Sequence, residues 1–161
     1  MRLTNSALPA LAVSALILTG CAHSTSSFAD TDRRLLMTGV GRFALFADLD
    51  TLQRHGDQAV IRALQVAEPG FEAGGTVYWG GWSWWAFDCT ATTADRLDFA
   101  SLDDQGREGP ATPEPSPAYP VAPGGDAAEL MATACGEVDA DLPLYTSLET
   151  AVAAGQSALT D

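Results

Sequence analysis

Two neighbouring segments carry apolar residues with a period of two, and this period constrains the fold more than any other feature of the sequence. In residues 42–48, Phe43 and Leu45 fall on one side of an extended chain. Residues 59–67 alternate in the same way. Gly56, between the two segments, can adopt the positive φ of a tight turn. The pattern predicts two antiparallel strands joined as a hairpin.

The stretch 76–89 predicts a further strand of unusual composition. It holds four tryptophans together with other aromatic and β-branched residues, which favour extended structure. The Gly80-Gly81 pair inside it predicts a bulge or a bend. Residues 96–102 predict another strand, in which Leu97 and Phe99 face inward.

The rest of the chain predicts a loop and two helices. Residues 110–123 contain six prolines and predict an extended loop that lacks donors for a strand ladder. Asp126 and Glu129 have the spacing of a capping box before a helix that leads to Cys135. Residues 146–149 repeat this capping pattern before a second helix.

The first 21 residues have the layout of a bacterial export signal. A charged start at Arg2 precedes an apolar run over residues 7–18, and Leu-Thr-Gly-Cys follows, ending at Cys21. A run of this length spans about 18 Å as a helix, too short for a bilayer core of about 30 Å. The last four residues are similar to a lipobox, so residues 1–20 are predicted to be a signal peptide that is cut before a lipidated Cys21. The alternative is an ordinary secretory signal with Cys21 as a spare thiol.

Cleavage at this point would leave a lipid anchor, a tether and one domain. Residues 21–38 begin with a Ser/Thr-rich stretch and are predicted to form a flexible tether, and residues 39–161 a single domain. Ala22 follows the cysteine, which by resemblance to enterobacterial sorting rules favours the outer membrane. Two or three acyl chains anchor a protein stably. We therefore expect an outer-membrane lipoprotein of the bacterial cell envelope, facing either the periplasm or the cell surface.

The charge balance excludes several classes of partner. The chain has no lysine, and without the signal it has seven arginines against 21 acidic residues, a formal charge of −14. Such a chain does not bind nucleic acid by neutralising phosphates. Anionic lipid headgroups would repel it. Membrane attachment is therefore predicted to depend on the N-terminal lipid alone, and Schiff-base chemistry on lysine is excluded.

Cys89 and Cys135 remain as a pair when Cys21 carries lipid. In an oxidising compartment such a pair predicts one disulfide. Two free buried thiols or a metal pair are the alternatives. A metal would need further ligands, and His23 and His55 give no four-ligand spacing, so neither a metal nor any other cofactor is predicted.

No set of residues predicts catalysis. Any Ser-His-acid site would need His55, which lies in the predicted turn, and the sequence offers no nucleophile-elbow motif near it. Neighbouring carboxylates such as Asp48 and Asp50 are expected in solvated turns, because a chain with 21 acidic residues forms such pairs easily. A function without enzymatic activity is therefore predicted.

A binding function would depend on the aromatic stretch. Four tryptophans within seven residues cannot easily enter one small core, and a large exposed aromatic patch usually marks an interaction site. Two interpretations stay open: these side chains fill the core, or an exposed patch contacts a protein or glycan partner. The candidate patch consists of Tyr78, Trp79, Trp82 and Trp84, whereas Trp85 is expected in the core.

Three blocks of sequence occur in a recognisable order between residues 40 and 135. The first runs from residue 44 to 64 as the predicted hairpin, and the second is Phe87-Asp88-Cys89 followed by the strand 96–102. The third begins at Tyr119-Pro120, passes through a Pro-Gly-Gly sequence and continues as a helix to Cys135. In this order the blocks resemble the surface-adhesin protein E family of small bacterial lipoproteins.

The resemblance implies an α+β fold: an antiparallel sheet of about six strands, a helix from the C-terminal half packed on one face, and a disulfide between Cys89 and Cys135. It also implies that some relatives on pathogens bind host matrix or plasma proteins. We therefore expect a lipid-anchored, non-enzymatic surface adhesin that binds host or surface macromolecules. The alternative is a periplasm-facing accessory or inhibitor subunit of an envelope complex, with no adhesive role.

Overall fold

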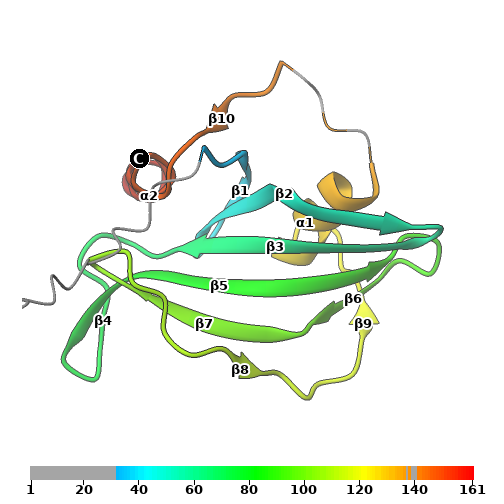
Figure 1. Cartoon of the computed structure of the whole chain (residues 1–161), viewed down its shortest axis with the longest axis horizontal. Coiled ribbons are helices and arrows are strands. Elements are labelled where there is room, and N and C mark those ends of the chain that lie inside the picture. The colour runs from blue at the N-terminus through cyan, green and yellow to red at the C-terminus, as the bar shows by residue number, and fades with distance from the viewer. Residues whose placement is uncertain (1–31, 137, 139–140) are drawn as a thin grey trace, which may run out of the picture.

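An antiparallel sheet forms the centre of the molecule (Figure 1). The computed structural model describes residues 32–136, 138 and 141–161. Strands β1 (Leu35–Val40), β2 (Ala44–His55), β3 (Gln58–Val66) and β5 (Thr76–Asp88) follow one another as a meander, each paired with the next. The predicted hairpin is confirmed: β2 and β3 are joined by a two-residue turn that begins at Gly56, with φ +59°.

The strand after β5 is divided into two parts. β6 (Thr93–Arg96) pairs with one end of β5, and β7 (Asp98–Asp103) pairs with the other. At the break, the backbone N–H of Trp84 donates to the Asp98 carboxylate at 2.8 Å. Beyond this break Ala100 and Leu102 are buried, while Leu97 is 39% exposed. The expectation that Leu97 faces inward is therefore wrong, because the break interrupts the alternation on which it depended.

Four strands of two residues each bring the described sheet to ten strands, more than the six predicted. The six longer strands make up most of the sheet, and short edge strands carry no apolar period from which they could be predicted. Two of the short strands interrupt the proline-rich stretch that was predicted to be a plain loop. The four are β4 (Glu72–Ala73), β8 (Thr112–Pro113), β9 (Tyr119–Pro120) and β10 (Leu144–Tyr145).

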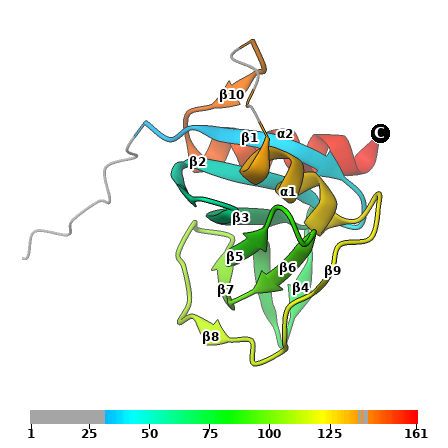
Figure 2. The same ribbon diagram turned by 90° about the vertical axis from the view of Figure 1, so that its right-hand side faces the viewer.

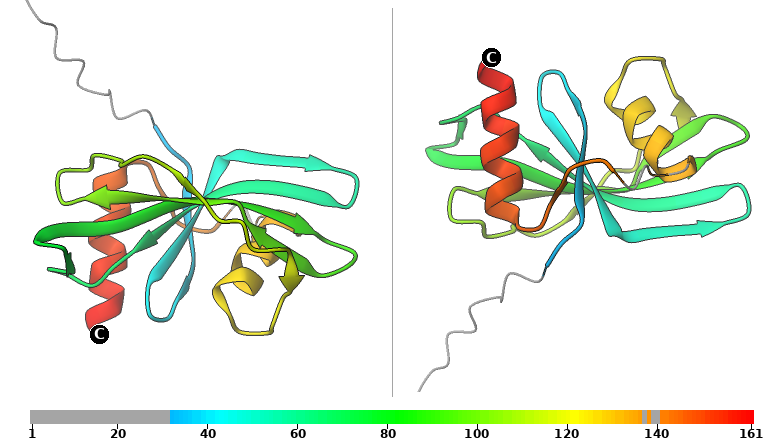
Figure 3. Two further views of the ribbon diagram at one scale, coloured as in Figure 1. Left: turned by 90° about the horizontal axis from the view of Figure 1, so that it is seen from below. Right: turned by 90° about the horizontal axis from the view of Figure 1, so that it is seen from above.

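Two helices pack on the sheet near different ends of its strands (Figures 2 and 3), and the apolar clusters beneath them lie on opposite faces. They are α1 (Asp126–Cys135) and α2 (Leu148–Thr160). In β2, Leu45 and Ala47 belong to the apolar cluster beneath α1, while Phe46 belongs to the cluster beneath α2. The antiparallel sheet with a packed helix is confirmed. We expected a helix on one face of the sheet only. This is incomplete, because α2 also buries part of the second face.

The helix starts differ from the predicted capping boxes. α1 has Gly125 at its N-cap position and no side-chain cap, so Asp126 lies inside the first turn. In α2 a capping box does form, between Ser147 and Thr150, one residue later than predicted. Neither helix in the described part of the chain is long and apolar enough to cross a membrane.

The domain begins earlier than predicted. Leu35 and Leu36 are buried on opposite faces of the sheet, one in each apolar cluster. Residues 35–38 therefore belong to β1 and not to the tether that was predicted to end at residue 38. The predicted signal peptide 1–20 and the lipidated Cys21 lie outside the described residues.

The predicted bulge in β5 is confirmed, and it depends on glycine. The register of β5 against β7 shifts between Tyr78 and Gly80. Gly80 has φ +143°, and a Cβ at this position would lie 1.8 Å from the backbone oxygen of Gln65 on the neighbouring strand. Only glycine fits here, because both the backbone conformation and the space exclude a side chain.

Substituting Gly80→Ala should lower the free energy of unfolding by about 2–4 kcal/mol, because the new Cβ both strains the backbone and displaces β3. Urea denaturation followed by tryptophan fluorescence measures the change. Gly41→Ala is the matched control, since a Cβ there meets no atom within 4 Å. Equal denaturation midpoints for the two variants would contradict this account of the bulge.

Candidate functional site: an apolar groove beside the disulfide

The predicted disulfide between Cys89 and Cys135 is confirmed, and it joins the turn after β5 to the last residue of α1. The turn covers residues 89–92. The Asp88 carboxylate organises it by accepting hydrogen bonds from the backbone N–H groups of Thr90 at 3.1 Å and Ala91 at 2.8 Å. The bond from Ala91 is the main cause that holds the pKa of Asp88 below its usual value.

A stripe of α1 faces this turn. Ala128, Met131, Ala132 and Cys135 have the spacing of one helix face, and all four line a groove between the helix and the turn. The adjoining side of the same helix is buried against the sheet through Ala127, Leu130 and Ala134, and Met131, which is 8% exposed, contributes to both. The helix is therefore apolar on two sides, one covered by the sheet and the other open to the groove.

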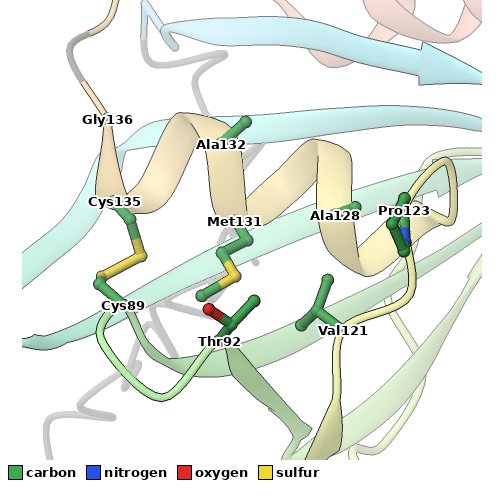
Figure 4. A pocket seen from close by; sticks show the side chains of 9 residues that line it. All are labelled: Cys89, Thr92, Val121, Pro123, Ala128, Met131, Ala132, Cys135 and Gly136. Carbon is green, nitrogen blue, oxygen red and sulfur yellow. A yellow bond between two sulfur atoms is a disulfide. The ribbon is translucent and has the colours of Figure 1, made fainter.

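The chain after β9 forms the third wall of the groove. Val121 and Pro123 lie on this wall, and the Val121 backbone N–H donates to the Thr92 carbonyl oxygen at 3.0 Å, which joins the wall to the turn. Figure 4 shows the Met131 side chain between the disulfide and Val121, with the Thr92 side chain beside it. The groove encloses about 480 Å³ and is open to solvent along its length.

Arg54 holds the end of α1 from outside the helix. Its guanidinium donates to the carbonyl oxygens of Ala134 at 2.6 Å and Thr133 at 3.1 Å, and also to that of Gly136. The last turn of α1 contains no basic residue of its own, so the charge that complements its carbonyls comes from β2. Together with the disulfide, Arg54 fixes the helix that forms one wall of the groove.

The groove can bind apolar groups but offers little chemistry. Thr92 contributes the only polar side chain among its nine lining residues, and both cysteines are oxidised. An apolar, concave surface with a single hydroxyl is suited to binding and not to acid–base or nucleophilic catalysis. His55 ends β2 and is exposed. Within the described residues, no group of three or more His, Cys, Asp or Glu side chains could hold a metal ion.

The structure does not gather the predicted aromatic residues into one exposed patch. Trp82 is 2% exposed and belongs to the cluster beneath α2, so its place in that patch is wrong. Trp79 packs partly buried against the same cluster, and Tyr78 and Trp84 are half-buried. Trp85 is buried beneath α1, as expected, with its ring stacked on Phe87. The patch hypothesis assumed that one face of β5 is exposed to solvent. In the structure both faces of β5 are partly covered, one by α1 and the other by α2.

A cluster of charged groups surrounds Trp82 where the described chain begins. The Arg33 and Arg62 guanidinium groups lie over its ring, with their central carbons 5.3 and 4.7 Å from the ring centroid. Arg33 also binds the Asp48 carboxylate at 3.3 Å, and Asp48 is only 3% exposed. The expectation that Asp48 lies in a solvated turn is wrong, because β2 continues through it and the start of the chain covers it.

The first described residues are thus attached to the sheet, and we call this attachment the N-terminal clasp. It consists of the Arg33–Asp48 pair, the hydrogen bond from Arg34 N–H to the Asp50 carboxylate at 2.9 Å, and that from Arg33 N–H to the Thr146 carbonyl oxygen at 2.9 Å. The clasp fixes the point at which the predicted tether meets the domain.

No protein-family model, curated protein sequence or solved structure matches the chain. The resemblance to the adhesin E family therefore remains a prediction from the three sequence blocks.

The groove itself was not predicted from the sequence. The available signal is the helix 126–135, in which only Asp126, Glu129 and Thr133 are polar. A helix that is apolar almost all round needs a second apolar surface in addition to its core contact. What the sequence could not show is that the turn 89–92 and the chain after β9 stop short of covering this second side.

Substituting Arg54→Ala should lower the free energy of unfolding by about 1–2 kcal/mol, because three carbonyl groups at the end of α1 lose a charged donor. Thermal and urea denaturation measure the loss. Arg34→Ala is the control, since its side chain is exposed and 4.0 Å from Asp50, a contact worth about 0–1 kcal/mol. A larger loss from Arg34→Ala than from Arg54→Ala would show that the cap does not hold the helix.

Burial, the largest cause, raises the pKa of Asp48 above its usual value, although Arg33 and the hydrogen bond from Asp50 lower it. Asp48 therefore binds a proton more tightly in the native state than in the unfolded chain, and this contribution to stability is present at low pH and lost as the pH rises through the raised pKa. We expect the stability of the wild type relative to Asp48→Asn to increase from pH 7 to pH 4. Urea denaturation of both proteins at the two pH values measures this difference. A difference that is constant or smaller at pH 4 would contradict the direction.

Proposed function

We propose that the chain is a lipid-anchored, non-enzymatic protein of the bacterial envelope, of the surface-adhesin type, which binds another macromolecule through the groove beside its disulfide. The observation that carries this proposal is the placement of the groove relative to the clasp. The clasp joins the start of β1 to the segment between β10 and α2, at one edge of the sheet. The groove lies toward β9, which forms the opposite edge in the strand order.

This placement suits a domain that is anchored at one edge of the sheet and binds its partner at the other. A short tether from Cys21 would meet the domain at the clasp, so that the groove points away from the attachment point. The groove is framed by a disulfide and by a helix whose end is capped by Arg54, so its walls are held before a partner arrives. Preformed apolar surfaces lose little conformational freedom on binding, which favours affinity.

The anchor is tested by the substitution Cys21→Ser. We expect the variant to leave the membrane fraction, because the acidic, lysine-free domain has no electrostatic attraction to anionic lipid. Fractionation of cells followed by immunoblotting measures the distribution. Cys89→Ser is the control, since it removes a disulfide partner and leaves the predicted lipidation site. Retention of the Cys21→Ser protein in the membrane fraction would refute the lipid anchor.

Exposure on the cell surface is tested separately. Protease added to intact cells should remove the domain if it is a surface adhesin, and a periplasmic protein in the same cells serves as the integrity control. Protection of the domain in intact cells, with digestion after the outer membrane is opened, would support the periplasmic accessory subunit instead.

A further inference from the structure

The arginine side chains of this domain make their contacts with other residues of the same domain. Six of the seven that follow the predicted signal bind a carboxylate or a backbone carbonyl, and the seventh, Arg42, lies over the ring of Phe43. Five of these seven positive charges are therefore paired with a carboxylate. The six and their partners are Arg33 with Asp48, Arg34 with Asp50, Arg54 with the carbonyls at the end of α1, Arg62 with Glu108, Arg96 with Glu114, and Arg107 with Asp103.

The carboxylates that remain give the surface its charge. Five acidic side chains pair with arginine, whereas others in the described part of the chain, such as Asp57, Asp104 and Asp126, form no ion pair with a basic side chain. Asp126, in the first turn of α1, is one of these and lies in the sequence between Pro123 and Ala128, which line the groove, whereas the Glu129 carboxylate lies against Gly39 of β1. A partner that approaches the groove therefore meets a negative field, which attracts cations and repels anions.

An exposed aromatic side chain lies beside the groove, in the same negative field. Tyr119 is 42% exposed, in β9. Desolvation is the main cause that raises the pKa of its hydroxyl; Arg96 lowers it, and the carboxylates of Asp126, Glu114 and Asp95 raise it further. Since Glu114 is paired with Arg96, Asp126 supplies the uncompensated negative charge on this side of the sheet, whereas Asp95 follows Ala94 in β6 and faces the other side.

Tyr119 and the groove form one surface. Tyr119 lies opposite Ala94 of β6, whose side chain is buried in the cluster beneath α1, so the tyrosine faces the same side of the sheet as α1. Val121 follows two residues later and lines the groove. An extended chain places residues two apart on the same side, so the ring and the groove wall are adjacent.

From this arrangement we propose that the groove and Tyr119 together bind an extended, cationic protein segment, in which an apolar side chain enters the groove and a neighbouring lysine or arginine lies against the Tyr119 ring. The apolar contact supplies affinity, and the cation is held by the aromatic face and by Asp126. This inference deepens the proposed function and rests on it, because it names the class of partner for the same site.

Three synthetic hexapeptides test the chemistry of the partner: alternating lysine and leucine, alternating glutamate and leucine, and alternating lysine and serine. The protein is the mature chain in phosphatidylcholine nanodiscs, with empty nanodiscs as the blank, and binding is measured by isothermal titration calorimetry. The lysine–leucine peptide should bind at least about tenfold more tightly than either of the others, since each of these lacks one of the two contacts. Raising the salt concentration to about 0.5 M should weaken its binding, because screening shortens the range of the acidic field.

Two substitutions on exposed helix positions locate the contact. Ala132→Arg places a cation at the mouth of the groove and should weaken binding of the lysine–leucine peptide about tenfold. Ala153→Arg adds the same charge to an exposed position of α2, away from the groove, and should leave binding within about twofold. Tyr119→Ser should reduce the preference for lysine over glutamate while the fold, followed by circular dichroism, is kept.

The outcomes separate this inference from the proposed function. Equal binding of the lysine and glutamate peptides, or equal effects of Ala132→Arg and Ala153→Arg, would overturn the cationic partner even if Cys21→Ser leaves the membrane and the domain is exposed on cells. Tighter binding of the glutamate–leucine peptide would also overturn it, and would leave the groove as a site for an acidic partner. Binding to the blank nanodiscs alone would show that the peptide recognises lipid and not the protein.

Discussion

Strands β2, β3 and β5 carry apolar side chains on both faces, and this requires the fold to cover both faces of the sheet. In β3, Ala59, Ile61 and Ala63 are buried on one face, and Leu64 and Val66 on the other. If either face of such a sheet stayed in water, folding would lose about 25 cal/mol of stabilising free energy for each Å² of apolar surface left unburied. α1 and α2 bury these side chains, one helix on each face of the sheet. Because the helices lie near different ends of the strands, each covers only part of the face on which it packs (Figure 3).

The close approach of α2 shows how tight this cover is. A Cβ on Gly155 would lie 3.0 Å from atoms of both Phe46 and Val66. A glycine weakens the middle of a helix by about 0.8–1.0 kcal/mol compared with alanine, and here it allows the helix backbone to lie directly on the sheet. α1 has no such glycine within it; it packs on the sheet through side chains such as Leu130, and covalent and charged contacts through Cys135 and Arg54 also hold its end.

The two modes of attachment have different consequences for function. α2 packs on its apolar cluster, with Ala151 and Val152 buried in it. α1 is fixed at its C-terminal end, and its outer apolar stripe remains open as the wall of a groove. The same disulfide that stabilises the domain therefore shapes the candidate site, so the stability of the fold and the geometry of the site cannot be varied independently at Cys89 and Cys135.

Local rules along the chain were enough to predict the hairpin around Gly56, the bulge at Gly80, two helices and, among open alternatives, a disulfide between Cys89 and Cys135. These follow from periodicity, backbone restrictions and cysteine number, all of which act over short stretches or on a single pair. Three features became visible only once the segments were packed together: Trp82 is buried, the start of the chain covers Asp48, and α1 keeps one apolar side open. Each of these depends on which segments meet across the fold, and a period of two along one strand does not say what lies above either face.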